Sequence, residues 1–364
     1  MKVYICQCNL RWCDREGNRA HIEELLSQAG ESGRAQGTAE GRMSSGIEAG
    51  DAEGTEVGQE SAGIEAGDAE GTEVGQESAG IETGDAEGTE VGQESAGIEA
   101  GDAEGTEVGQ ESAGIEAGDA EVGQESAGIE AGDAEVGQES AGIETGGLIV
   151  LPEMFSTGFI TMPAGEAESD GASLGWMKAI AKKYGCAVAG SVATEDGGLF
   201  YNRFYFVKPD GTFVKYDKRH LFSFAGEDRR FTAGSEKVIT EYNGVRFFLQ
   251  ICYDLRFPCF SRNILPNPYD AVIYVASWPS PRIGAWETLL KARAIENQCY
   301  AIGVNRVGKD PSCQYNGHSS IVDPYGNASA SCAEGVEEIV SADLDLDSLQ
   351  AFRDKFPVLK DADR

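Results

Sequence analysis

Apolar and polar residues alternate, or recur in helical steps, along most of this chain. Residues 2–10 alternate as a strand with one buried face does. Residues 18–30 repeat their large apolar side chains at helical spacing, which predicts a helix ending at Gly30. An uninterrupted apolar run begins at Gly147 and predicts a strand that is buried on both faces.

The rest of the chain continues in the same two periods. Its pattern predicts, in order, a helix at 171–185, a strand at 186–194, a hairpin at 200–218 with Pro-Asp-Gly at its turn, strands at 245–253 and 269–277, a helix at 285–298, a strand at 300–308 and a last strand pair around 319–331. Strands separated by helices indicate an α/β fold, and the hairpins make its sheet mixed.

A tandem repeat interrupts this order between residues 45 and 146. Its unit, SAGIEAGDAEGTEVGQE, recurs every 17 residues, and two later copies are shortened to 14. Of the 62 acidic residues in the chain, 29 lie in this block, which has no Lys or Arg. The formal net charge of −33 therefore belongs mostly to the repeat, and the remaining residues carry 33 acidic against 29 basic side chains.

A fixed period is also typical of solenoid proteins, so the repeat has two interpretations. Each unit offers only Ile and Val as large apolar residues, too few to offset backbone ordering at roughly 1 to 2 kcal/mol per residue. The period also differs from the nine-residue unit of calcium-binding β-rolls. We therefore predict a disordered, Gly-rich insert at 31–146 within a discontinuous domain formed by 1–30 and 147–364.

Composition excludes several classes of protein. The chain has no run of about 18 apolar residues, and its first residues lack the pattern of a signal peptide, so we expect no membrane span. An odd number of cysteines, nine, without disulfide-type spacing predicts reduced thiols and a cytoplasmic location. Cys6, Cys8 and Cys13 lack a second cysteine pair and the chain has only three His, so we expect no metal site. The acidity argues against nucleic-acid binding.

Cys252 is a candidate nucleophile because of its place between two unlike segments. It ends an apolar strand and precedes the polar segment YDLRFP, which places the thiol at the carboxyl end of the strand. Open α/β sheets bind their ligands at that end. Taken alone, a cysteine after an apolar strand is also consistent with a buried core thiol.

Two charged residues stand in comparable positions. Glu153 ends the apolar run LIVLPEMF, where burying a carboxylate is costly unless it has a partner or a reaction to serve. The alternative is a buried salt bridge. Lys218, in the segment FVKYDKRHLF, stands at the end of the predicted hairpin, and its alternative is an ordinary surface lysine beside Lys215 and Arg219.

Three ordered segments, LIVLPEMFSTGF, YDKRHLF and QICYDLRFP, resemble the signatures of the nitrilase, or carbon–nitrogen hydrolase, superfamily. The segments GEDRRFTAG, VASWPSP, LLKARAIENQCYAIGVNRVG and AFRDKFPVLKDADR are similar to its omega-amidase, YafV-like branch. The resemblance covers 2–30 and 147–364. It implies a single-domain α-β-β-α sandwich, no metal or organic cofactor, and a homodimer.

The resemblance also implies a Glu-Lys-Cys catalytic triad of Glu153, Lys218 and Cys252. Cys252 would attack the substrate, Glu153 would act as base and then acid, and Lys218 with the backbone N–H of Tyr253 would stabilise the oxyanion. Glu227 matches a further glutamate that steadies the lysine and the substrate. Its alternative is a surface acid near two arginines.

Substrate choice depends on residues around the triad. Arg256 matches an arginine that holds the substrate carboxylate in omega-amidases, and its alternatives are a pair with Asp254 or a helix end. Phe155 and Trp278 are expected to wall the pocket, or else to be core aromatics. These residues favour short dicarboxylic monoamides such as 2-oxoglutaramate and 2-oxosuccinamate.

The sequence leaves three functions open. The first is an omega-amidase-like hydrolase that acts on a small amide carrying a carboxylate and releases ammonia. The second is an N-carbamoyl amide hydrolase with the same triad. The third is an inactive carrier of the acidic repeat. Because the insert joins the strand before Glu153 at its amino end, we expect the repeat to leave the pocket open.

Overall fold

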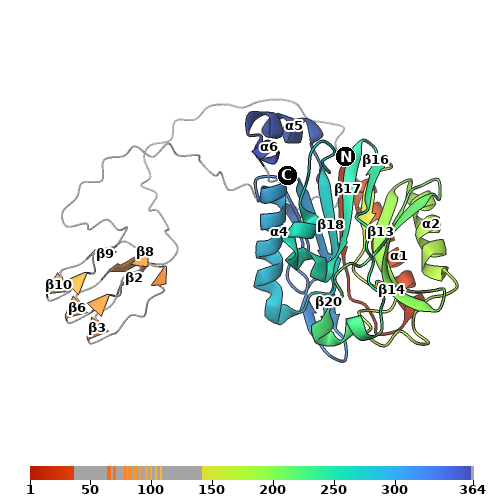
Figure 1. Cartoon of the computed structure of the whole chain (residues 1–364), viewed down its shortest axis with the longest axis horizontal. Coiled ribbons are helices and arrows are strands. Elements are labelled where there is room, and N and C mark those ends of the chain that lie inside the picture. Colours follow the sequence, from red (N-terminus) through yellow and green to blue (C-terminus); the bar gives the residue numbers. More distant parts are fainter. Residues whose placement is uncertain are drawn as a thin grey trace. The chain divides into compact units, whose positions relative to one another are not determined.

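The computed structural model describes residues 1–36, short strands between 64 and 108, and residues 142–361. The chain divides into two units, Met1–Met43 with Val136–Arg364, and Ser44–Glu135. The first unit is a sandwich of two six-stranded sheets between two layers of helix (Figure 1). Among the described residues, no helix is long and apolar enough to cross a bilayer.

The first sheet has the order β15-β14-β13-β12-β1-β24. Strands β1, β12 and β13 run parallel, and the outer strands pair antiparallel to their neighbours. The strands are β1 (Lys2–Gln7), β12 (Leu148–Val150), β13 (Ala187–Asp196), β14 (Leu199–Val207), β15 (Phe213–Asp217) and β24 (Glu338–Asp343).

The second sheet has the order β16-β17-β18-β19-β22-β23, with β17, β18 and β19 parallel. Its strands are β16 (Ile239–Tyr242), β17 (Val245–Ile251), β18 (Ala271–Ala276), β19 (Tyr300–Asn305), β22 (Ser320–Val322) and β23 (Ala328–Ser331). A separate two-stranded ribbon pairs β20 (Val307–Lys309) with β21 (Gln314–Asn316).

Strand periodicity divides the apolar side chains between three layers. Ile5 and Val150 of the first sheet pack against Leu249 and Ile273 of the second, between the sheets. Tyr4 points to the opposite face of β1, because successive side chains on a strand alternate, and packs toward the helices.

Helices cover both outer faces (Figure 1). Helices α1 (Arg15–Gln36) and α2 (Ala172–Tyr184) cover the first sheet, and α4 (Ile283–Asn297) covers the second. The remaining helices are α3 (Pro258–Ser261), α5 (Leu346–Lys355), α6 (Val358–Asp361) and the 3₁₀ turns η1 (Ser223–Ala225), η2 (Glu227–Arg229), η3 (Cys252–Arg256) and η4 (Ser280–Arg282). The predicted α-β-β-α sandwich is confirmed.

Several element boundaries differ from the prediction, and two of the differences have a clear physical reason. Helix α1 continues past Gly30 to Gln36, since one interior glycine costs only about 1 kcal/mol and need not end a helix. Strand β12 stops at Val150, because Pro152 has no N–H for a sheet ladder. Strands β16, β21 and β24 have no clear alternation and were not predicted.

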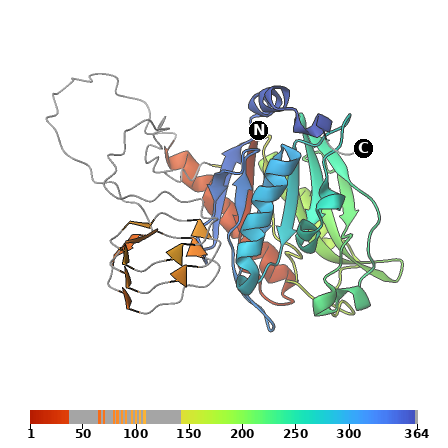
Figure 2. The same ribbon diagram turned by 60° about the vertical axis from the view of Figure 1, so that its left-hand side comes forward.

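The insert enters and leaves the sandwich at one end. Helix α1 runs from the carboxyl end of β1 back toward the end at which the amino terminus lies (Figure 2). At that end Tyr4 donates to the carbonyl of Gly142, Lys2 pairs with Glu144 at 2.6 Å, and Asn243 donates to the carbonyl of Gly146. Residues 142–146 therefore contact the sandwich, and the bounds of the insert, 31–146, stay a prediction.

The described strands of the second unit follow the sequence repeat. Each pairs in parallel with equivalent residues 17 positions away in the sequence, as Ile64 does with Ile81 and Glu90 with Glu107. They are β2 (Ile64–Ala66), β3 (Ala69–Glu70), β4 (Ser78–Ala79), β5 (Ile81–Thr83), β6 (Ala86–Glu87), β7 (Glu90–Val91), β8 (Ser95–Ala96), β9 (Glu99–Ala100), β10 (Ala103–Glu104) and β11 (Glu107–Val108). Most of the block lies outside the described residues, so its disorder stays a prediction.

Candidate active site

Three loops that follow strands bring the predicted triad together. Glu153 stands three residues past the end of β12, Lys218 directly follows β15, and Cys252 directly follows β17. Glu153 and Lys218 have no exposed surface, while Cys252 is partly exposed. A buried carboxylate and a buried ammonium thus lie beside the thiol of Cys252.

The Glu153 carboxylate accepts three hydrogen bonds. Its Oε1 accepts from Lys218 Nζ at 2.9 Å and from Asn202 Nδ2 at 2.8 Å. Its Oε2 accepts from the backbone N–H of Ser277 at 2.8 Å. These bonds fix the orientation of the carboxylate, and they satisfy the condition under which burial of a charge is tolerated.

The Lys218 ammonium lies between two carboxylates. Besides Glu153, its Nζ donates to Glu227 Oε2 at 2.9 Å. Burial by itself would lower the pKa of Lys218, but Glu153 and Glu227 outweigh it and raise that pKa above its ordinary value. Lys218 is therefore a fixed cation, and the alternative of a surface lysine is wrong.

Glu227 is equally enclosed. It has no exposed surface, and it accepts from the backbone N–H of Phe222 at 2.6 Å and from Asn202 at 3.1 Å. Burial raises the pKa of Glu227, and Lys218 opposes that change. The alternative of a surface acid is wrong for this residue also.

Cys252 stands at a sharp backbone turn. Its φ is 44°, a left-handed conformation that is uncommon for residues other than glycine and is found at functional sites. Loss of hydration raises the pKa of the Cys252 thiol well above 9.0, Glu153 raises it further, and Lys218 lowers it. The resting thiol is therefore protonated and needs a base before it can attack.

Asn202 and Ser277 belong to the site but were not predicted. Asn202 shares the inner face of β14 with Phe204 and Phe206, so a polar residue in that alternating series was a readable signal. Ser277 acts through its backbone N–H, which leaves no signal in the residue type.

Arg256 lies at the rim of the site, exposed, with its Cζ 4.9 Å from the centroid of the Trp278 ring. The alternative pair with Asp254 is absent, because that carboxylate accepts from the Tyr216 hydroxyl, from Ile251 N–H and from His220 N–H. Arg256 forms no ion pair with the residues that the structure describes.

The two predicted wall residues have different surroundings. Trp278 follows Ser277 directly, and its backbone N–H donates to Asn305 Oδ1 at 2.7 Å. Phe155 is fully buried in the helix-side core, where its ring stacks at 5.5 Å on Trp176. The core interpretation therefore fits Phe155, because the side chain packs between the first sheet and α2. Phe159, 5.3 Å from the Lys218 ammonium, is an aromatic neighbour of the triad that was not predicted.

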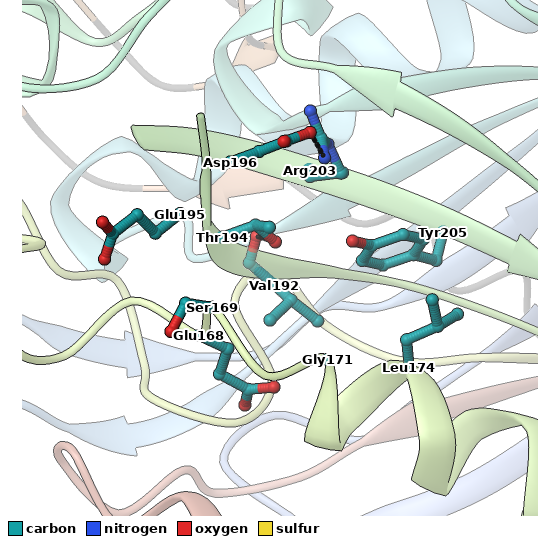
Figure 3. Close-up of a pocket in the computed structure, with 10 residues that line it drawn as sticks. All are labelled: Glu168, Ser169, Gly171, Leu174, Val192, Thr194, Glu195, Asp196, Arg203 and Tyr205. Atoms are coloured by element: carbon teal, nitrogen blue, oxygen red, sulfur yellow. Dashed lines mark hydrogen bonds and ion pairs between the residues drawn. The ribbon is translucent and has the colours of Figure 1, made fainter. Parts of the chain in front are cut away.

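A hollow of about 200 Å³ lies on the outer face of the first sheet beside α2 (Figure 3). Arg203 faces it and pairs with Asp196 and Asp217, while its neighbour Asn202 faces the triad. Glu168 in this hollow already accepts from Ser173. The hollow is therefore distinct from the triad, and its Arg203 and Glu168 are already partnered.

A sandwich with a thiol, a carboxylate and an ammonium at adjoining strand ends is the architecture of one family of hydrolases. Residues 126–354 match the model of the carbon-nitrogen hydrolase family, and the chain belongs to that family. It is thus a hydrolase of carbon–nitrogen bonds, as the sequence predicted.

Relatives and solved structures agree with that assignment. The chain is 46% identical over 220 residues to omega-amidase YafV of Yersinia enterocolitica, covering 60% of this chain and 84% of the relative. It is 40% identical over 220 residues to 2-oxoglutaramate amidase of Bacillus subtilis, covering 59% and 84%. A crystal structure of a CN-hydrolase superfamily protein of Xanthomonas campestris, with an arsenic adduct in its active site, aligns with a TM-score of 0.66 at 27% identity, covering 100% of this chain and 97% of the other.

Proposed function

We propose that this carbon–nitrogen hydrolase is an omega-amidase that cleaves the terminal amide of short dicarboxylic monoamides, such as 2-oxoglutaramate and 2-oxosuccinamate. The observation that carries the proposal is the contact between Lys218 and Glu153 at 2.9 Å beside Cys252, whose thiol both charges influence. The similarity to relatives named omega-amidase and 2-oxoglutaramate amidase supports the choice of substrate.

The first half of the reaction forms a thioester. Glu153 takes the proton from the Cys252 thiol, and the thiolate attacks the amide carbon. The carbonyl oxygen becomes an oxyanion, and the tetrahedral intermediate collapses when Glu153 returns the proton to the leaving nitrogen. The products of this half are ammonia and an acyl group on sulfur.

The oxyanion needs fixed positive charge, and Lys218 supplies it. Because the pKa of Lys218 is raised, the ammonium stays charged throughout the reaction. The backbone N–H of Tyr253, in the first turn of η3, is the second proposed donor. A donor of this kind is worth about 3 to 4 kcal/mol in comparable sites.

The second half consumes water. Glu153 removes a proton from a water molecule, the hydroxide attacks the thioester, and the proton passes to the departing sulfur. The substrate carboxylate leaves with the acid product, and Cys252 is restored as a thiol. Arg256, which stacks on Trp278 without an acidic partner among the described residues, is the proposed anchor of that carboxylate.

Ammonia release from 2-oxoglutaramate and 2-oxosuccinamate tests the proposal. We expect turnover by the full chain and none by Cys252→Ala. Cys259→Ala is the matched control, because Cys259 is an exposed thiol seven residues away, and it should keep the full rate. Equal ammonia release by the full chain and by Cys252→Ala would rule out the proposed chemistry.

The same assay separates the rival substrates. Carbon dioxide released from N-carbamoyl compounds, at a higher kcat/KM than ammonia from the monoamides, would replace the omega-amidase proposal with an N-carbamoyl amide hydrolase. The homodimer implied by the family resemblance is part of the proposal, and analytical ultracentrifugation of the full chain tests it.

A further inference from the structure

Two arginines lie over the aromatic rings of Trp278 and Phe222, residues that adjoin the catalytic cluster. The Arg256 guanidinium lies over the Trp278 ring. Arg282, the last residue of η4, has its Cζ 5.5 Å from the centroid of the Phe222 ring. A guanidinium stacked in this way keeps its N–H edge free to bind a second group.

Both rings lead directly to the triad. The Phe222 ring lies 5.0 Å from the ring of Tyr253, the residue after Cys252. The backbone N–H of Phe222 donates to Glu227, the second carboxylate beside Lys218. Trp278 follows Ser277, whose N–H donates to Glu153. Each arginine therefore lies over a ring whose own residue, Phe222, or preceding residue, Ser277, donates a backbone hydrogen bond to a carboxylate of the cluster.

Trp278 connects the two arginines. Its face lies under Arg256, and its indole N–H donates to the carbonyl of Arg282 at 2.7 Å. The backbone N–H of Arg282 donates to the carbonyl of Pro279 at 3.0 Å, which closes the η4 turn. The backbone of Arg282 is thus fixed, and only its guanidinium is left to a ligand.

Arg282 differs from Arg203, Arg293 and Arg353, which each pair with a carboxylate. The Arg282 guanidinium forms no ion pair and no hydrogen bond with the described residues, although the chain carries 62 acidic side chains. An arginine kept free of internal partners beside a reactive centre is suited to an anionic ligand.

We propose that Arg282 is a substrate-binding residue that acts together with Arg256 as a clamp of two guanidinium groups. The clamp takes the end of the substrate that bears a carboxylate next to a 2-oxo group. One guanidinium binds the carboxylate through two hydrogen bonds, and the other binds a carboxylate oxygen and the 2-oxo oxygen. This inference rests on the proposed omega-amidase function and adds a second arginine to its substrate site.

Kinetics on three amides test the clamp. The amides are 2-oxoglutaramate, glutaramate, which lacks the 2-oxo group, and pentanamide, which lacks both groups. For Arg282→Met we expect kcat/KM to fall at least about 30-fold on 2-oxoglutaramate, mostly through KM, and less than about threefold on pentanamide. Glutaramate should fall between these values. Equal losses on all three amides would overturn the proposal.

Two further variants control for charge and shape. Arg282→Lys keeps the positive charge but loses the planar guanidinium and its paired N–H donors. It should therefore recover only part of the preference for 2-oxoglutaramate over pentanamide. Lys182→Met removes one positive charge from an exposed site on α2, and it should leave the preference unchanged. If Lys182→Met and Arg282→Met lower this preference equally, the effect comes from the net charge of the protein and the clamp is wrong.

A binding experiment separates the clamp from the proposed function. Calorimetry measures the affinity of Cys252→Ala for 2-oxoglutarate, the acid product, and compares it with Cys252→Ala combined with Arg282→Met. We expect the second variant to bind at least about 30-fold more weakly. If that loss occurs but the full chain hydrolyses no monoamide, the clamp stands and the proposed function fails. If the chain hydrolyses monoamides and the affinity is unchanged, the clamp fails alone.

Discussion

The Tyr216 hydroxyl donates to Asp254 Oδ2 at 2.8 Å and so joins the segment of Lys218 to the segment of Cys252. Tyr216 lies two residues before the lysine, and Asp254 lies two residues after the cysteine. Asp254 also accepts from the N–H of Ile251, which precedes the cysteine, and the Tyr216 oxygen accepts from the N–H of Arg219. Together with the bond from His220 N–H to Asp254 Oδ1, this contact holds the two proposed catalytic segments next to each other.

Tyr216→Phe should loosen this connection. It leaves the Arg219 N–H without its acceptor and Asp254 with one donor fewer, so we expect a loss of about 1 to 3 kcal/mol in the free energy of unfolding. We also expect kcat to fall about tenfold with little change in KM, because the substrate anchors are untouched. Denaturant unfolding and steady-state kinetics measure the two effects.

The control for this change is Tyr205→Phe. Tyr205 is also buried, and its hydroxyl forms no hydrogen bond with the described residues. It faces the hollow on the helix side of the first sheet, so its loss should leave kcat unchanged. If both variants lower kcat equally, the contact between Tyr216 and Asp254 has no special part in catalysis.

Glu153→Gln should separate thiolate formation from catalysis. The charge of Glu153 raises the pKa of Cys252, so its removal should lower that pKa and increase the thiolate fraction at about pH 9. Activity should nevertheless fall by about 10³-fold, because the general base is lost. Alkylation by iodoacetamide over a pH series, followed for the Cys252 peptide by mass spectrometry, measures the first effect.

Cys259 gives an internal reference in the same experiment. Its thiol is exposed, and its alkylation profile should not differ between the two proteins. An unchanged or higher midpoint for Cys252 in Glu153→Gln would mean that Glu153 does not control the thiol.

Asn202→Asp should destabilise the protein in a way that depends on pH. Asn202 donates to Glu153 and Glu227, and an aspartate in its place would add a third buried carboxylate. Its pKa would be raised in the folded state, so the protonated form is favoured and stability is lost as pH rises above about 4. We expect a loss of about 3 kcal/mol or more at pH 7 and a smaller loss near pH 4.

Asn327→Asp is the matched substitution at the surface. Asn327 is exposed and donates to Asp323 at 3.2 Å, so the same change should cost less than about 1 kcal/mol. Urea unfolding at several pH values compares the two variants. A loss in Asn202→Asp that does not depend on pH would contradict the expected burial of charge.

Removal of residues 37–141, with a short Gly-Ser linker in their place, should leave kcat/KM within about threefold of the full chain, because closure entropy changes only slowly with loop length. A tenfold loss with the fold intact by circular dichroism would contradict this. Deletion of 31–146 is the comparison, because it also removes Glu144 and Gly146, which contact Lys2 and Asn243. The larger deletion should lower Tm more.

The sequence placed Glu153, Lys218 and Cys252 at strand ends, but only the family resemblance made them a predicted triad, because each residue alone also fits a structural role. The sequence could not predict Asp254, Tyr216 or Arg282 as partners, because hydrogen bonds and ring contacts between distant segments leave no local pattern. Ser277 was missed for a related reason, since its backbone donates and any residue except proline has that donor.

Most strands and helices could be predicted because the spacing of apolar residues along the chain decides which side chains enter the core. On β1, for example, alternation sends Ile5 between the sheets and Tyr4 toward the helices. Phe155 shows the limit of this reasoning. It stands two residues past Glu153, but the loop directs its ring into the core beside Trp176, and nothing in the residue type indicates that direction.

The position of Lys218 between two carboxylates has a consequence for turnover. With the thiol neutral, the enclosed groups hold one ammonium and two carboxylates, which leaves one negative charge. When the proton passes from Cys252 to Glu153, that charge moves from oxygen to sulfur and the total is the same. No counterion has to approach or leave these buried groups during the step, so Glu153 and Cys252 exchange a proton at constant total charge.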